Sequence, residues 1–375
     1  MLIGKSVLQP HGYKAFIPEK FPPQELIPMD AELVKLLSDA DLSLGKLDGS
    51  TQWLPDIDFF IFMYVRKEAA LSSQIEGTGA TLVDAIKADA QFTKKLPKDV
   101  DDILHYIKAM NTGLQRLETI PLSLRLICEV HKELLTGARS DHFPAPGEFR
   151  TTQNWIGGNS PATAKFVPPP IHEMKMSLGD LENFLHSDDD LPSLVKTALM
   201  HAQFETIHPF LDGNGRTGRL LITFYLCQKG ILERPVLYLS EYFKRNRDIY
   251  FELLHSYHQE GDISRWVKFF LQGVNEVARD AADTSRKITE LHKKNMIKIQ
   301  SLGRSSEKAM NILMELYKLP IVNVKKVGEW VKASRMTANT LVNKLVDVGV
   351  LHQQDESKEY GRVFEYREFL RIFIS

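Results

Sequence analysis

The sequence predicts an all-α protein with one β-hairpin inside its helical core and a separate small module after it. Apolar residues recur at helical spacing over most of the 375 residues. The pattern breaks for a long stretch at 141–170, where six prolines surround short apolar pieces typical of a loop with a short hairpin. Beyond residue 304 it becomes three short helices and two strand-like pieces, an arrangement that resembles a winged helix-turn-helix.

The elements follow in order along the chain. Residues 1 to about 30 contain Pro22-Pro23 and are expected to be extended. A helix is expected from Asp30, because the apolar residues between Leu33 and Leu44 fall on one face. Further helices are expected at 58–70, 101–119, 122–136, 172–186, 192–207, about 212–229, 240–259 and 263–280. We divide the chain into an N-terminal helical region, a core, a polar linker and a C-terminal module, at residues 1–100, 101–282, 283–304 and 305–375.

Composition limits the classes of function. A hydrophobic content of 43% allows a sizeable core, and a net charge of −1 gives no overall field for nucleic acid or acidic membranes. The two cysteines, Cys128 and Cys227, each lie in an apolar helical context and indicate buried thiols in a reducing compartment. No run approaches the roughly 18 apolar residues that span a bilayer, and the first residues lack a signal-peptide pattern. We therefore expect a cytoplasmic protein with no membrane partner.

The segment His208–Arg219, with the sequence HPFLDGNGRTGR, carries the chemistry. Its three glycines let backbone N–H groups approach an anion, and the apolar run after it predicts a helix whose start favours phosphate. Arg216 and Arg219 add forked donors one helical turn apart. Asp212 suggests a metal ligand, because Mg²⁺ takes one or two carboxylates together with phosphates. His208 has a pKa suited to a general base near neutral pH, so the segment predicts a polyphosphate site with a base.

These twelve residues match every fixed position of the signature H-P-F-x-[DE]-G-N-G-R-x-x-R, so the chain resembles the Fic family. The resemblance implies a helical core that transfers AMP from ATP to a Ser, Thr or Tyr hydroxyl of a protein. His208 would take the hydroxyl proton, and Asp212 would hold Mg²⁺. Arg216 would hold the β-phosphate and Arg219 the γ-phosphate. The remaining positions assigned to nucleotide binding within the motif are Gly213, Asn214, Gly215, Thr217 and Gly218.

A second motif lies far upstream. Residues 72–77, with the sequence SSQIEG, match the inhibitory motif [ST]-x-x-x-E-[GN] of Fic proteins, with Ser72, Glu76 and Gly77 at its fixed positions. The resemblance implies that Glu76 reaches the nucleotide site and pairs with Arg219, occupying the guanidinium needed for the γ-phosphate. We therefore expect an adenylyltransferase held at low basal activity. Two alternatives stay open: a deAMPylase in which Glu76 orients an attacking water, and a non-enzymatic, nucleotide-responsive regulator that acts through residues 305–375.

The proline-rich break at 147–170 resembles the Fic flap. An exposed strand edge there can align a target by main-chain pairing and place its hydroxyl beside His208, so we expect a protein substrate to dock on it. Self-modification and a homodimer stay open as further partner states. The positions selected for nucleotide contact outside the motifs are Ile156, Gly157, Gly158 and Asn159 in the flap, and Asn246 and Tyr250 for the adenine pocket.

The C-terminal module invites a DNA-binding interpretation, but its charge is weak. Residues 304–375 hold 12 Lys/Arg and 9 Asp/Glu, a surplus of three. The expected recognition helix offers only Arg335, Asn339, Asn343 and Lys344. Because strong DNA binders usually show a denser basic face, we favour contact with a protein over contact with DNA.

Overall fold

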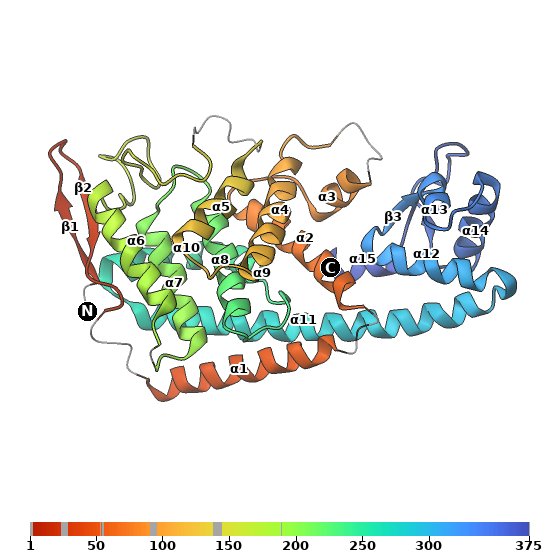
Figure 1. Cartoon of the computed structure of the whole chain (residues 1–375), viewed down its shortest axis with the longest axis horizontal. Helices are drawn as coiled ribbons and strands as arrows, with labels where there is room; N and C mark the ends of the chain where they lie inside the picture. The colour runs from red at the N-terminus through yellow and green to blue at the C-terminus, as the bar shows by residue number, and fades with distance from the viewer. Residues whose placement is uncertain are drawn as a thin grey trace.

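The computed structural model describes residues 3–23, 29–52, 54, 56–90, 96–137, 145–188 and 190–374. The molecule is elongated and mostly helical, with the C-terminal module at one end of its longest helix (Figure 1). This confirms the predicted all-α class. The elements before the C-terminal module are β1 Gly4–Leu8, β2 Lys14–Pro18, α1 Ala31–Thr51, α2 Ile57–Ile75, α3 Leu82–Asp89, α4 Val100–Leu117, α5 Leu124–Leu135, α6 Ile171–His186, α7 Ser193–Ile207, α8 Asn214–Gln228, α9 Ser240–Arg245, α10 Arg247–Glu260 and α11 Ile263–Gln300.

Helices α7 and α8 form the centre of the core, and the loop between them carries the glycine-rich motif (Figure 1). Nearly every residue of both helices is buried, as expected for helices that are surrounded by others. Helix α7 packs against α6, α10 and α11, while α8 packs against α2, α4 and α5. The motif loop is therefore supported on rigid elements from both sides.

The N-terminal residues are extended, as expected, and they also pair. β1 and β2 form an antiparallel hairpin in which Lys5 lies opposite Ile17. The Phe16 ring lies 5.9 Å from the Phe166 ring, measured between centroids. The backbone N–H of Phe16 donates to the Val167 carbonyl oxygen at 2.9 Å. The hairpin thus covers the far end of the flap segment.

Three elements differ from the sequence expectation. Helix α11 continues to Gln300 instead of ending near residue 280, because Ile288, Leu291 and Ile299 remain buried on one face among charged neighbours. The helix expected at 240–259 is broken into α9 and α10 at Asn246, whose φ and ψ of −108° and 37° are not helical. Helix α3, eight residues long and started by a capping box between Thr81 and Asp84, was not expected.

The C-terminal module contains the predicted three helices and hairpin, together with a further strand and a final helix. Its elements are a short 3₁₀ turn η1 Gly303–Ser305, α12 Ser306–Lys318, β3 Ile321–Asn323, α13 Val324–Trp330, α14 Arg335–Asp347, β4 His352–Gln353, β5 Val363–Glu365 and α15 Arg367–Ile374. The antiparallel sheet has the order β3-β5-β4. Helix α15 joins the module to the rest, because the Phe373 ring packs edge-on against Tyr64 of α2 at 5.5 Å. Among the described residues, no helix combines the length and apolar character needed to cross a bilayer.

Candidate active site

The loop between α7 and α8 begins at His208, which ends α7 in a left-handed conformation with a φ of 47°. Few non-glycine residues adopt this conformation, so the surrounding structure must hold it. Arg150 Nε donates to the His208 carbonyl oxygen at 3.0 Å, and Asn154 Nδ2 donates to the same oxygen at 3.1 Å. Both side chains are buried and both come from the flap segment. The flap therefore fixes the backbone that carries His208.

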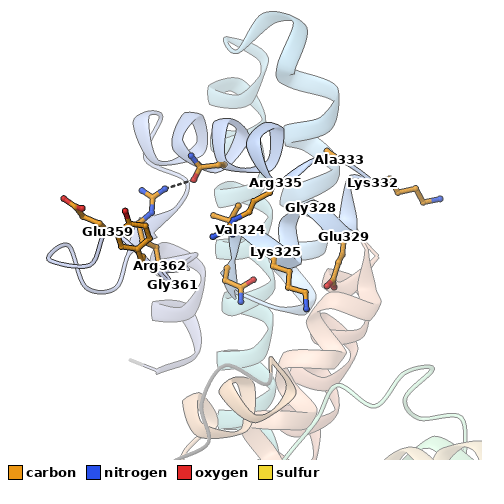
Figure 2. A pocket seen from close by; sticks show the side chains of 13 residues that line it. Val324, Lys325, Gly328, Glu329, Lys332, Ala333, Arg335, Glu359, Gly361 and Arg362 are labelled. Atoms are coloured by element: carbon orange, nitrogen blue, oxygen red, sulfur yellow. Dashed lines mark hydrogen bonds between the residues drawn. The ribbon is translucent and has the colours of Figure 1, made fainter.

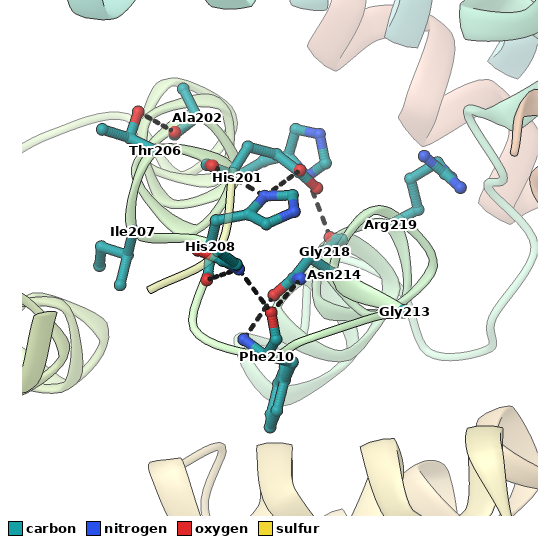
Figure 3. A network of polar contacts seen from close by, with 12 residues as sticks. His201, Ala202, Thr206, Ile207, His208, Phe210, Gly213, Asn214, Gly218 and Arg219 are labelled. Atoms are coloured by element: carbon teal, nitrogen blue, oxygen red, sulfur yellow. Dashed lines mark hydrogen bonds and ion pairs between the residues drawn. The ribbon is translucent and has the colours of Figure 1, made fainter. Parts of the chain in front are cut away.

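The side chain of Asn214 closes the loop. Its Oδ1 accepts from the Phe210 N–H and its Nδ2 donates to the Phe210 carbonyl oxygen, both at 2.8 Å (Figure 3). Gly213 precedes the helix with a φ of 76°, a conformation that suits glycine. The Asn214 amide thus shapes the turn, and the N–H groups at the start of α8 are the part of the loop that favours an anion.

Arg219, on the second turn of α8, is held by helix α2. Its Nε donates to Ser72 Oγ at 2.8 Å, and its Nη2 donates to the Ser72 carbonyl oxygen at 2.9 Å and to Glu76 Oε1 at 2.8 Å. The Arg219 side chain is 2% exposed and that of Glu76 is 40% exposed. The structure thus brings Ser72 and Glu76 to Arg219, which lies more than a hundred residues later in the sequence.

The Glu76 carboxylate lies where an anion would bind. A Cβ added to Gly215 would meet Glu76 Oε1 at 2.3 Å, so the carboxylate rests against the first turn of α8. Burial raises the pKa of Glu76, but the charge and the hydrogen bond of Arg219, together with the charge of Arg216, lower it by more, so the pKa lies below its usual range. Glu76 is therefore an anion at neutral pH and occupies the position favoured by the helix start and by Arg219.

Arg216 and Asp212 form a second charged pair beside the loop. Arg216 Nη2 lies 3.5 Å from Asp212 Oδ2, and Nη1 lies 3.8 Å from Asp102 Oδ1. Among the described residues, no three His, Cys, Asp or Glu side chains cluster as a metal site. Mg²⁺ commonly binds one or two carboxylates and completes its shell with waters and substrate phosphates. The single, partly exposed Asp212 carboxylate fits a magnesium ion that arrives with a nucleotide.

A cavity of about 940 Å³ opens beside these groups, between the flap, α7, α8 and α10. This volume is in the range of sites for small organic ligands. The residues that line it are Glu76, Trp155, Ile156, Gly157, Lys165, Phe166, Glu205, His208, Gly215, Arg219, Arg247, Asp248, Tyr250, Phe251, Glu252, Leu254, His255 and His258. It therefore contains the imidazole of His208, Gly215 and Arg219 of the motif, together with Glu76.

The imidazole of His208 is set up as a base. Its Nδ1 lies 3.3 Å from the Glu205 carbonyl oxygen, which can only accept, so this nitrogen carries the proton and Nε2 has the free lone pair. Burial lowers the pKa of His208 to about 4. This value lies below the near-neutral pKa expected from the sequence, because the ring is buried. The ring is therefore neutral over the physiological pH range, with the Nε2 lone pair available to accept a proton.

Glu205 adds a buried carboxyl to the same cavity. Its Oε2 lies 3.9 Å from His208 Nδ1, and its Oε1 is buried without a hydrogen-bond partner among the described residues. Burial raises the pKa of Glu205 to about 8; Arg219 opposes this rise and Glu76 adds to it. The group is thus mostly protonated, and uncharged, at neutral pH.

A second histidine connects three helices behind the cavity. His201 Nδ1 contacts the Gly218 carbonyl oxygen at 3.0 Å (Figure 3). Its Nε2 contacts Tyr250 Oη at 2.9 Å. Because the carbonyl only accepts, Nδ1 carries the proton and Tyr250 donates to Nε2. Tyr250, which is 1% exposed, therefore borders the cavity from a fixed position instead of offering an open stacking face.

Several predicted nucleotide residues do not line the cavity. In the flap, Ile156 and Gly157 border it, whereas Gly158 and Asn159 turn toward the tip, where the Asn159 N–H donates to Thr163 Oγ1 at 3.2 Å. The flap hairpin itself is reduced to one bridge, between Ile156 and Phe166.

The remaining predicted positions are also outside the lining, including Gly213, Asn214 and the predicted metal ligand Asp212. Thr217 is fully buried, and Gly218 packs against Glu205, where an added Cβ would meet Oε1 at 2.4 Å. Asn246 lies at the break between α9 and α10. Its side-chain Nδ2 donates to the Tyr242 carbonyl oxygen at 3.0 Å. Arg216 is buried beside its two carboxylates and is also outside the lining.

Sequence reasoning missed several groups that support the site. His131 on α5 accepts from the Gly147 N–H at 2.9 Å and reaches the Asp212 carbonyl oxygen at 3.0 Å, so it joins the flap to the motif loop. Its ring also stacks on Phe210 with a centroid distance of 3.6 Å. A lone histidine on an apolar helix face gives no signal of these contacts. The other missed groups are Glu68, Arg150, Asn154 and Glu205.

The C-terminal module has its own hollow, of about 720 Å³, between α13, α14 and the loop before β5 (Figure 2). Basic and acidic side chains both border it: Lys325, Lys332, Arg335 and Arg362 with Glu329 and Glu359. Arg362 Nη2 donates to Asn339 Oδ1 at 2.6 Å, which ties the loop to α14 (Figure 2). Met336 and Tyr360 nearby are 80% and 86% exposed.

Comparison with known proteins places this fold and this loop in one family. Residues 34–115 match the family described as Fic/DOC family N-terminal, and residues 121–226 match the Fic/DOC family. The chain belongs to the Fic family. It is similar to the solved structure of a Fic family protein from Desulfovibrio desulfuricans, with a TM-score of 0.58 at 17% identity over 92% of this chain and 98% of that one. A Fic domain-containing signalling protein from Bacteroides thetaiotaomicron has a TM-score of 0.55 at 19% identity, covering 67% and 98% of the two chains.

Among curated proteins, the chain is similar to Protein adenylyltransferase Fic of Drosophila grimshawi, with 34% identity over 166 residues. It is also 33% identical over 111 residues to a probable protein adenylyltransferase of Aquifex aeolicus. These matches cover 44% and 30% of this chain, and 30% and 32% of the relatives. The chain thus spans about a third of the length of these relatives.

Proposed function

We propose that this chain is a protein adenylyltransferase that transfers AMP from ATP to a hydroxyl group of a protein. The observation that carries the proposal is one cavity that contains a neutral imidazole with a free Nε2, Gly215 in the first turn of α8, and Arg219. These are a base, an anion cradle and a cationic clamp. The relatives named protein adenylyltransferase support the same reaction.

In this reaction His208 Nε2 takes the proton of the target hydroxyl as its oxygen attacks the α-phosphorus. The new oxygen–phosphorus bond forms while the bond to the α,β-bridging oxygen breaks, and pyrophosphate leaves. The backbone at the start of α8 and Arg219 neutralise the phosphate charge, which is the main contribution a protein makes to such transfers. Asp212 would hold Mg²⁺, whose charge compensates that of the phosphates.

We propose further that Glu76 keeps this activity low. Its carboxylate bonds Arg219 and rests on Gly215, so it competes with a phosphate for both groups. For the protein substrate we propose the flap as the docking site. Trp155 and Ile156 are 40% and 37% exposed at the mouth of the cavity, and they offer an apolar contact for the target segment.

The reaction class is tested by labelling ATP at either the α- or the γ-phosphate. The Glu76→Gly variant is incubated with Mg²⁺ and a cell lysate, and the labelled proteins are separated on a denaturing gel. Retention of the α-label with loss of the γ-label is expected for adenylyl transfer. Retention of the γ-label would instead identify a kinase, and retention of neither would refute the proposal.

The opposite reaction, removal of AMP from a modified protein, is the second candidate. It is favoured by the position of Glu76, a carboxylate in the same cavity as His208 that could orient a water. Incubating the wild-type chain with AMP-modified target and Mg²⁺ in the absence of ATP separates the two reactions. Release of AMP that is lost in Glu76→Gly would favour deadenylylation.

Nucleotide affinity is expected to weaken as the pH rises through about 8, because Glu205 then ionises beside the phosphate site. The sign follows from the raised pKa: below it the carboxyl is neutral, and above it a new negative charge repels the anion. The check is a titration of ATP binding to the wild-type chain between neutral and alkaline pH. Glu205→Gln should abolish this inflection while keeping the affinity measured at neutral pH. An inflection that survives in Glu205→Gln would assign it to another group.

For the C-terminal module we propose contact with a protein and not with DNA. The hollow mixes both charge signs, and the exposed Met336 and Tyr360 suit an apolar partner surface. Fluorescence anisotropy with duplex DNA should give only non-specific binding, with a Kd on the order of 10⁻⁶ M or weaker at physiological salt. Tight, sequence-selective binding that Arg335→Glu abolishes would contradict this.

A further inference from the structure

Helix α2 carries two further polar residues in line with Glu76, Ser72 and Glu68. Glu68, Ser72 and Glu76 are spaced by four residues, so they lie on one face of the helix, one turn apart. Ser72 and Glu76 both bond Arg219. These three polar residues form one row along α2, which we call the α2 polar row.

The bonds from Ser72 to Arg219 do not depend on Glu76. Two hydrogen bonds of Arg219 remain if the Glu76 side chain moves away. Arg219 Nε still donates to Ser72 Oγ, and Arg219 Nη2 still donates to the Ser72 carbonyl oxygen. Two donors on different nitrogens fix both the position and the plane of a guanidinium. Arg219 therefore keeps its orientation without its ion pair.

Glu68 anchors the same part of α2 from behind. Its Oε1 accepts from Ser240 Oγ at 2.5 Å and from Tyr106 Oη at 3.1 Å, and its Oε2 accepts from the Ser240 N–H at 3.2 Å. Ser240 begins α9 and Tyr106 belongs to α4, so one buried carboxyl joins three helices. Glu68 is 3% exposed and Ser72 is completely buried.

The end of the row is different. Glu76 is the residue that caps α2, and Gly77 follows it with a φ of 95°. The helix around it is held independently, because Lys244 Nζ donates to Gln74 Oε1 at 2.6 Å and Arg247 Nε donates to the Ile75 carbonyl oxygen at 3.2 Å. The 40% exposed Glu76 side chain can leave Arg219 by rotating, with α2 in place.

We propose that Glu68 and Ser72 are positioning residues that hold Arg219 ready for the terminal phosphate, so that α2 is a permanent part of the nucleotide site and only the Glu76 side chain is inhibitory. This inference rests on the proposed function for the identity of the nucleotide. If the whole of α2 were a removable inhibitory helix, loosening the α2 polar row at Ser72 or Glu68 would relieve inhibition. Our inference predicts the opposite: the same changes weaken ATP binding.

The test uses the full chain carrying Glu76→Gly, in which the pair with Arg219 is already absent. Adding Ser72→Ala should weaken ATP binding by about tenfold, the effect of losing one hydrogen bond to a charged group, while AMP binding stays unchanged because AMP lacks the phosphates that Arg219 reaches. Glu68→Gln, which keeps the size but puts a donor where Ser240 donates, should act in the same direction. Ser73→Ala is the matched control, because Ser73 is equally buried on α2 and its Oγ has no partner among the described residues.

Affinities are measured by calorimetry, and transfer is measured separately with α-labelled ATP. Unchanged ATP affinity in both Ser72→Ala and Glu68→Gln, or an increase, would overturn the inference even if transfer occurs. A parallel loss of ATP and AMP binding would also overturn it, because that indicates general damage to the site. A third outcome separates the two proposals. If Ser72→Ala and Glu68→Gln selectively lose ATP binding but Glu76→Gly transfers no AMP, the inference is upheld and the proposed function is refuted.

Discussion

Replacing Glu76 with glycine should raise the rate of AMP transfer by about 10- to 30-fold at matched Mg·ATP. The change removes a carboxylate that bonds Arg219 Nη2 and rests on Gly215, so a phosphate can take both contacts. A hydrogen bond between charged groups contributes about 1.5–3 kcal/mol, and the partial exposure of Glu76 places the effect in the lower part of that range. Each 1.36 kcal/mol corresponds to about a factor of ten.

The measurement is incorporation of the α-label into protein per unit time. Glu118→Gly is the matched control, because Glu118 also caps a helix but lies on the surface away from the cavity. Adding Arg219→Ala to Glu76→Gly should return the rate to a low level, since the clamp that was freed is then missing. Equal rates in wild type and Glu76→Gly would refute inhibition by this carboxylate, and a rise in Glu118→Gly would show that loosening of helix ends is enough.

The site divides into parts that sequence could and could not reveal. His208, Gly215 and Arg219 lie within twelve consecutive residues, so their chemistry and spacing are readable directly. The contact of Glu76 with Arg219 joins positions 143 residues apart, and it was anticipated only because a short motif resembled that of a family. Propensity and periodicity carry no such long-range information.

Buried polar partners were the least predictable. Glu68 follows Lys67 in the sequence and reads as one more charged residue of an amphipathic helix, yet it is buried among hydroxyl groups of two other helices. Nothing in the local sequence indicates that Ser240, far along the chain, will supply those donors. Helix α11 shows the same limit for the fold: its charged exposed face made residues 283–304 read as a linker, although the apolar face that packs inside continues to Ile299.

Replacing His208 with asparagine should lower AMP transfer by roughly 100- to 10,000-fold, the usual contribution of a general base, while ATP affinity is retained. The expectation separates two tasks of this residue. Its ring has Nε2 free to take a proton, whereas its backbone adopts a left-handed conformation that Arg150 and Asn154 hold from the flap. Asparagine tolerates that conformation better than alanine does, so the variant removes the base and leaves the turn.

The measurement compares single-turnover transfer with ATP binding in the Glu76→Gly background, where both are large enough to follow. The pH profile adds a second check, because a base whose pKa is lowered to about 4 stays deprotonated until strongly acidic pH. The acid limb of kcat/KM, which reports the free enzyme, should therefore lie well below the ordinary histidine value of 6.5. If His208→Asn lost ATP binding at an unchanged melting temperature, the imidazole would be holding the phosphate cradle and some other group would have to accept the proton.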